Sequence, residues 1–313
     1  MADKKILIIG IGGFIGRFVS AYLAHRNFKV WGLSRNPDRL TGRQFSRIKL
    51  LKWNGTSVDT LSRYICGSDA VLNLAGENIG SGLWSRKKKA AILLSRVNVG
   101  EALTQAVLRL PEGERPSILQ ASAVGFYGSR GDEVLDEQSP KGGGFLPNVV
   151  EKWEHAVEPL REHGLRVVML RFGVVWAANG GALPRMLLPF RMFLGGTFGD
   201  GSQFMPWIHY FDLARAIEFF LRHKNLEGIF NITSPNPIRN RDFTAIAGQL
   251  LRRPGWLVAP AWILRFMLKE AADEMLLSSQ RVVPRRLAEE GFTFHFPDVK
   301  IAIQDLLNRE KNE

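Results

Sequence analysis

Three glycines spaced three residues apart create a place for a phosphate near the start of the chain. Gly10, Gly13 and Gly16 lie between a short apolar run and an amphipathic helical pattern. In such a strand–turn–helix unit, the first glycine permits a tight turn, the second lets the backbone approach a pyrophosphate, and the third lets the helix pack closely. The N–H groups of Phe14 and Ile15, at the start of the helix, have no partner within it and attract anions. The loop predicts a dinucleotide site; the alternative is a purely structural turn.

The end of the next predicted strand indicates which dinucleotide is bound. Strand 30–33 is followed by Ser34 and Arg35, where NAD-preferring proteins commonly place an acidic residue for the ribose hydroxyls. An arginine cannot accept those hydrogen bonds, whereas its guanidinium can clamp a 2′-phosphate to which Ser34 also donates. We therefore expect NADP(H) as the cofactor. The alternative is that Arg35 is a solvated residue at a strand end.

Elements that position these residues follow from the hydrophobic pattern. Apolar runs with the length of buried strands lie at 6–9, 30–33, 48–51, 70–74, 118–121 and 167–170. Helical patterns lie between them at 14–25, 92–108 and 149–162. Such an alternation forms a parallel sheet covered by helices on both faces, with right-handed crossovers. We predict an α/β fold of the Rossmann type, with a doubly wound parallel sheet and a smaller C-terminal lobe.

The second half of the chain is punctuated by Gly and Pro and has a looser pattern. We assign residues 1–175 to the NADP(H)-binding domain and expect 206–232 to return to it through a helix and a strand. Residues 176–205 and 233–313 then form the substrate-binding lobe.

Charge and composition exclude several classes of function. The chain has 42 Lys and Arg against 30 Asp and Glu, a net charge of +12, and its densest basic cluster runs from Arg86 to Lys89. No nucleic-acid-binding motif accompanies this cluster, so we interpret it as a solvated helix face and expect no nucleic-acid partner. Cys66 is the single cysteine, so no disulfide can form within the chain. The sequence contains no Cys/His spacing of the zinc type, and we expect no metal site.

The distribution of apolar residues indicates where the protein works. The N-terminal apolar run is shorter than a signal-peptide core, and no stretch approaches the roughly 20 apolar residues of a membrane span. We expect a cytoplasmic protein with no membrane partner. Nothing in the sequence predicts an oligomeric state.

Further motifs resemble those of one protein family. The glycine loop and the segment Asn-Leu-Ala-Gly-Glu-Asn-Ile at 73–79 are similar to extended short-chain dehydrogenase/reductases. The resemblance is to their atypical epimerase-family group, also described as nucleoside-diphosphate-sugar epimerase-like. It implies that NADP(H) is also held by Leu74, Ala75 and Gly76 and by Arg96 on the following helix. Other matching segments lie at 122–128, 152–154, 187–191, 206–209, 280–286 and 291–292.

The catalytic residues that the resemblance implies are absent from their usual places. Active members of the superfamily use a Tyr as acid/base, a Lys four residues later, and a Ser or Thr that orients the substrate. In this sequence Leu146 and Val150 occupy the Tyr and Lys places, and Ala123 occupies the hydroxyl place. None of these side chains can transfer a proton.

Three other residues are candidates for proton transfer. Tyr127 is a candidate acid/base and Ser122 a candidate orienting hydroxyl, because both follow the fifth strand at the ligand-binding edge of the sheet. His209 is an alternative acid/base, because imidazole titrates near neutrality. The structural alternatives are a packed aromatic, a turn hydroxyl and a hydrogen-bonding histidine, respectively.

The sequence therefore supports two functions. The first is an NADP(H)-dependent oxidoreductase or epimerase-like enzyme that acts on a small polar substrate, phosphorylated or nucleotide-linked. The second is a non-catalytic NADP(H)-binding protein that senses redox state or regulates a partner.

Overall fold

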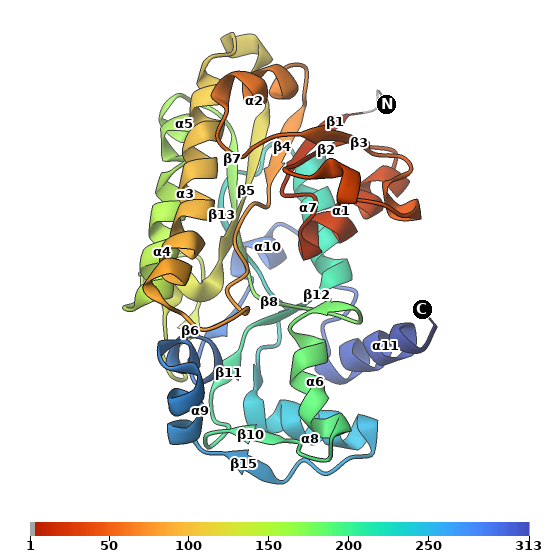
Figure 1. Ribbon diagram of the computed structural model, residues 1–313, viewed down its shortest axis with the longest axis vertical. Coiled ribbons are helices and arrows are strands. Elements are labelled where there is room, and N and C mark those ends of the chain that lie inside the picture. The colour runs from red at the N-terminus through yellow and green to blue at the C-terminus, as the bar shows by residue number, and fades with distance from the viewer. Residues whose placement is uncertain (1–3, 313) are drawn as a thin grey trace.

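The buried apolar runs form one central sheet in the computed structural model, which describes residues 4–312 (Figure 1). Its strands are β1 (Lys5–Ile9), β2 (Lys29–Ser34), β3 (Lys49–Lys52), β4 (Ala70–Asn73), β5 (Ser117–Ala123), β7 (Val167–Phe172) and β13 (Gly228–Ile232). All pair in parallel, in the order β13-β7-β5-β4-β1-β2-β3. The order reverses between β1 and β4, and ligands bind at such a reversal, beyond the carboxyl ends of the strands.

Helices cover both faces of this sheet (Figure 1). One face packs on α1 (Phe14–His25), α7 (Tyr210–Arg222) and α10 (Arg285–Glu289). The other packs on α2 (Val58–Ile65), α3 (Arg86–Leu108) and α5 (Glu158–Glu162), with α4 (Phe145–His155) beside α3. Each face has its own core of buried Val, Leu and Ile side chains. The predicted doubly wound parallel sheet is confirmed.

The C-terminal lobe has a third apolar core and small sheets (Figure 1). Its helices are α6 (Leu183–Arg191), α8 (Asn240–Leu251), α9 (Ala261–Leu268) and α11 (Val299–Asn312). A three-stranded sheet contains β8 (Val174–Ala177), β9 (Gly180–Gly181) and β12 (Trp207–His209). The paired short strands are β6 (Val134–Leu135) with β16 (Arg281–Val282), β10 (Gly196–Phe198) with β15 (Leu257–Ala259), and β11 (Phe204–Met205) with β14 (Ile238–Arg239).

One segment crosses the boundary that the sequence suggested. We assigned 233–313 to the lobe, whereas Leu287 and Phe292 lie in the core beneath the central sheet, together with side chains of α1 and α7. The chain therefore returns to the central sheet a second time, after the return through α7 and β13.

Candidate functional site

The glycine loop connects β1 to α1 through a tight turn. Gly10 has φ +82°, a conformation that suits glycine, and its carbonyl accepts a hydrogen bond of 3.0 Å from the Gly13 N–H. A Cβ on Gly16 would lie 2.4 Å from the Gly10 carbonyl oxygen, so α1 packs directly on the turn. A Cβ on Gly10 would lie 2.9 Å from the backbone of Leu74 and Ala75, so the loop after β4 contacts this turn.

The start of α1 fits an anion. Gly13 is the N-cap and is exposed, no side chain caps the helix, and its first turn holds no acidic residue. Among residues 4–312, the first N–H groups, including those of Phe14 and Ile15, thus have no side-chain acceptor, and the helix dipole adds a partial positive charge there. These features suit the pyrophosphate of a dinucleotide.

The end of β2 carries positive charge next to this loop. A Cβ on Gly12 would lie 3.8 Å from the Ser34 hydroxyl, which accepts a hydrogen bond from the Asn36 N–H. Arg35 is exposed and forms no ion pair within the described residues. Arg39, in the short 3₁₀ helix that follows, is also exposed and unpaired there; the sequence reasoning missed it, although the Asn36–Pro37 turn signal precedes it.

Arg96 of α3 lies under the loop after β4. A Cβ on Gly76 would lie 3.1 Å from the Arg96 guanidinium carbon, which is 4.9 Å from the centre of the Trp153 ring. Burial lowers the pKa of Arg96 to about 10, which leaves it protonated at neutral pH. The neighbouring carboxylate of Glu77 is bound by Lys88 at 2.7 Å instead. Arg96 therefore brings a positive charge to this loop, and no carboxylate in the described part of the chain binds it directly.

Leu146 and Val150, which occupy the positions of the usual Tyr and Lys, also lie together beside the turn after β5. A Cβ on Gly125 would lie 3.5 Å from the Leu146 Cβ and 4.0 Å from a methyl carbon of Val150. Both side chains of α4 thus face the turn that follows β5. They add apolar contacts there and no proton donor.

Ser122 belongs to a buried ion-pair network. Its hydroxyl donates to Glu154 Oε1 at 2.5 Å, and Arg171 donates to both oxygens of the same carboxylate at 2.8 Å. Ser122 and Arg171 are almost completely buried. The hydroxyl is thus held by α4 in this structure.

Tyr127 lies at the other end of the same network. Its hydroxyl accepts a hydrogen bond from Arg171 at 3.1 Å and donates to Asn231 Oδ1 at 2.7 Å. The side chain is fully buried, and burial raises the pKa of Tyr127 to about 12. These contacts anchor the turn after β5 to β7 and β13.

His209 lies elsewhere, among the C-terminal elements. It caps α7, where its Nδ1 accepts a hydrogen bond of 3.2 Å from the Phe211 N–H. Its ring stacks on Phe296 at 3.9 Å, and its Nε2 is 3.3 Å from an Asp305 carboxylate oxygen. Burial lowers the pKa of His209 to about 4. The structure thus joins Ser122 to Tyr127 and gives His209 a different set of contacts.

A family model described as the NAD dependent epimerase/dehydratase family matches residues 6–233. The chain belongs to this family. The resemblance inferred from the motifs is thereby confirmed. A second model, of a domain of unknown function, matches residues 259–306, which include α9 and much of α11.

Relatives in this epimerase family align over nearly the whole chain. An epimerase family protein of Mycobacterium tuberculosis is 37% identical, over 94% of this chain and 95% of its own. Epimerase family protein SDR39U1 of Mus musculus is 36% identical, over 97% of this chain and 99% of its own. The crystal structure of human SDR39U1 with NADPH has 31% identity and a TM-score of 0.85, covering 99% of this chain and 100% of that one. UDP-glucose 4-epimerase of Thermus thermophilus, 17% identical over 98% and 99% of the chains with a TM-score of 0.78, shares the fold.

The candidate cofactor site is located by the loops that follow the central strands, whereas a cavity in the structure lies in another part of this epimerase-family fold. A cavity of about 210 Å³ lies between α6, α8, β10 and β15, and its lining is mainly apolar and includes no residue of the glycine loop. The loops after β1, β2 and β4 instead bring the glycine turn, Ser34 and the backbone of Leu74 and Ala75 to one edge of the sheet. Within residues 4–312 no group of His, Cys, Asp and Glu is arranged to hold a metal ion. No described helix is long and apolar enough to cross a membrane.

Proposed function

We propose that this protein binds NADP(H) in preference to NAD(H). The observation that carries the proposal is that Ser34 ends β2 beside the glycine loop and is followed by Arg35, whose guanidinium binds no carboxylate among the described residues. A free guanidinium forms two charge-assisted hydrogen bonds with a phosphate. Arg39 adds a second exposed cation nearby in the chain. The NADPH in the structure of human SDR39U1 supports the same choice.

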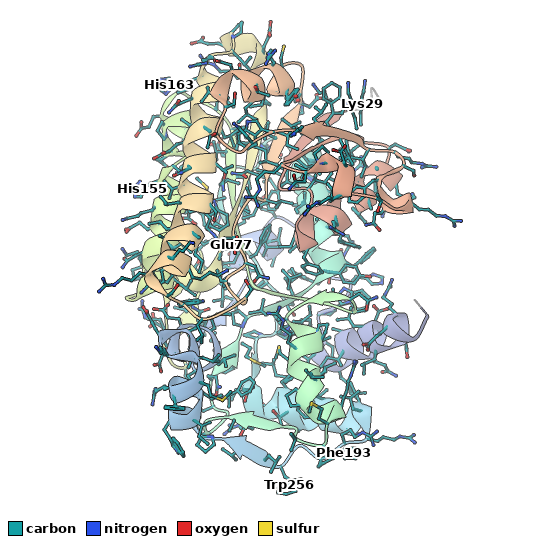
Figure 2. All side chains as sticks on the ribbon, in the orientation of Figure 1. Lys29, Glu77, His155, His163, Phe193 and Trp256 are labelled. Atoms are coloured by element: carbon teal, nitrogen blue, oxygen red, sulfur yellow. The ribbon has the colours of Figure 1, made fainter. Side chains whose placement is uncertain are left out.

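Exchanging the charge at Arg35 tests the cofactor preference. We expect Arg35→Asp to raise the Kd for NADPH ten- to hundredfold, because charge-assisted hydrogen bonds contribute about 1.5–3 kcal/mol, and to change the Kd for NADH less than threefold. Fluorescence titration with each nucleotide measures both constants. Lys29→Asp is the matched control, because it makes the same charge change at the opposite end of β2, where Figure 2 shows Lys29 at the edge of the molecule. Equal losses for both nucleotides would overturn the preference.

We infer that the bound cofactor serves an oxidoreductase or epimerase-like reaction on a small polar substrate, phosphorylated or nucleotide-linked, in the cytoplasm. The cofactor would supply or accept a hydride. The chain would hold it through the N–H groups of α1 and through Arg35 and Arg96. The proton must come from groups other than Leu146 and Val150, and Tyr127 is fully buried.

The pair Glu77 and Lys88 is the proton source that we propose. Lys88 Nζ lies 2.7 Å from Glu77 Oε1 and 2.9 Å from the Ser81 hydroxyl, and the Glu77 side chain is 40% exposed. Figure 2 shows Glu77 where the loop after β4 meets the lobe. Both residues retain contact with solvent, through which a proton can be replaced.

A non-catalytic NADP(H)-binding sensor is the second candidate. It is favoured by the aliphatic Leu146 and Val150 and by the burial of Ser122, Tyr127 and His209. Mass spectrometry of a cellular metabolite pool, incubated with the protein and NADPH or NADP⁺, separates the two. We expect a cofactor-dependent change of mass or isomer that Glu77→Gln abolishes. No change in a sample that binds NADPH would favour the sensor.

A further inference from the structure

Exposed apolar side chains gather on three neighbouring segments of the C-terminal lobe. Phe266 is 84% exposed, Trp256 76% and Trp262 69%, although side chains of these types usually lie inside. We call this surface the apolar end face. Its members are Phe193, Leu194, Trp256, Val258, Trp262, Phe266 and Met267.

Local structure brings these segments together. Strands β10 and β15 pair in parallel, and the Leu257 N–H donates to the Gly195 carbonyl, so the turn after α6 lies beside the start of β15. Figure 2 shows Phe193 and Trp256 at the same end of the molecule. Helix α9 begins two residues after β15, and Trp262 and Phe266, four residues apart, share one side of it.

The backbone around this face is held in unfavourable conformations. Phe193 has φ +62°, which is rare for a bulky residue, and the Arg253 guanidinium lies 4.2 Å from the centre of its ring. Arg252 and Lys269, at the two ends of the segment that carries β15 and α9, also have positive φ. Backbone strain of this kind persists where the surrounding structure enforces it, and it often accompanies function.

The unpaired charges on the segment that carries the face are positive, because the acidic residues next to it, Glu270 and Asp273, are bound by Lys89 and Arg265. Residues 252–269 contain Arg252, Arg253, Arg265 and Lys269 and no Asp or Glu. Arg265 is paired with Asp273, whereas the other three have no carboxylate partner in the described part of the chain. An isologous contact with a second copy would bring these cations together, which is unfavourable. The occupant that complements this face is apolar and anionic.

We propose that the apolar end face docks on the surface of an anionic phospholipid membrane. Exposed Trp and Phe beside Lys and Arg are the composition of segments that lie in the membrane interface, where each cation contributes about 1 kcal/mol with anionic lipids. The eight residues of α9 span about 12 Å, so the helix would lie in the interface. From the sequence we expected no membrane partner, because no apolar stretch is long enough to span a membrane. The sequence could not show that these apolar side chains are exposed.

Vesicle sedimentation of the full chain tests this proposal. We expect the protein to sediment with phosphatidylcholine vesicles that contain 30% phosphatidylglycerol and to remain in the supernatant with phosphatidylcholine alone. The bound fraction should fall at least fivefold in Trp262→Ser/Phe266→Ser and in Arg252→Glu/Arg253→Glu. It should also fall at 0.5 M salt, which screens surface charge.

Leu94→Ser/Ile301→Ser is the matched control, because it removes two exposed apolar side chains from other helices. It should sediment like the wild type, and thermal melting should show that all variants are folded. Equal sedimentation with both vesicle types, none with either, or full binding by the Trp262/Phe266 variant would overturn the proposal. A wild type that forms dimers in analytical ultracentrifugation, and loses them in that variant without vesicle binding, would assign the face to a second copy.

Discussion

Arg171 is a residue whose structural role comes from partners that are distant in the sequence. It binds Glu154 through two nitrogens and the Tyr127 hydroxyl through a third. A buried cation is costly unless its hydrogen-bonding groups are satisfied, and here α4 and the turn after β5 satisfy them. The network therefore fixes α4 against the sheet, with Leu146 and Val150 facing the turn after β5.

His209 gives a prediction about stability and pH. Its pKa is lowered to about 4 by burial, near Asp305, Arg309 and His295, whereas an unfolded histidine titrates near 6.5. The unfolded chain therefore binds more protons between these values, and the free energy of unfolding falls as the pH drops from about 6.5 to 4. The difference corresponds to about 3 kcal/mol.

Urea unfolding between pH 7 and 4.5 measures this dependence. We expect His209→Gln to reduce it, because glutamine can still accept a hydrogen bond from the Phe211 N–H but takes up no proton. His163→Gln is the control, because His163 lies on the surface, as Figure 2 shows, and it should leave the dependence intact. An unchanged slope in His209→Gln would show that other groups cause it.

Residues of the site differ in how far the sequence could predict them. The glycine turn is local, since Gly10, Gly13 and Gly16 contact one another within seven residues, so spacing alone predicted it. The contacts of Ser122 and Tyr127 come from residues 32 and 104 positions away, and no local pattern shows them. Burial and partners, which decide whether a hydroxyl can act, belong to the tertiary structure.

Elements were predicted best where the hydrophobic period was uninterrupted. All seven central strands and α1 lie where the pattern indicated, because buried parallel strands are continuous apolar runs. The expected helix at 149–162 divides into α4 and α5, because Pro159 has no N–H to continue the first helix and lies in the first turn of the second. The short α2 (Val58–Ile65) was not expected at all.

Helix α3 begins at Arg86, six residues before the expected start at 92, because the expectation followed the apolar pattern and the first turn is basic. Arg86–Lys89, interpreted from the sequence as a solvated helix face, are thus the first turn, where four basic residues oppose the helix dipole. In the structure Ser85 caps the helix by accepting a hydrogen bond from the Lys88 N–H. Glu77 and Glu270 bind Lys88 and Lys89, and both carboxylates come from other segments.

At the scale of the whole molecule, residues 259–306, which match the domain of unknown function, are hydrogen-bonded to helix α4 beside the central sheet. Glu274 Oε1 and Oε2 accept hydrogen bonds from the N–H groups of Phe145, at 2.7 Å, and Leu146, at 3.1 Å. The N-cap of α4 is Gly144, which has no side chain to do this. A carboxylate about 130 residues along the chain thus caps the helix that carries Leu146 and Val150.

Removing this cap should destabilise the whole protein. We expect Glu274→Ala to lower the free energy of unfolding by about 1–2 kcal/mol, the usual cost of losing a helix N-cap, as measured by urea denaturation. Glu270→Ala is the matched control from the same segment, because its ion pair with Lys89 is partly exposed and such pairs contribute about 0–1 kcal/mol. Equal losses of unfolding free energy in the two variants would mean that the α4 cap contributes no more stability than an exposed ion pair. A loss confined to Glu274→Ala would show that residues 259–306 stabilise α4.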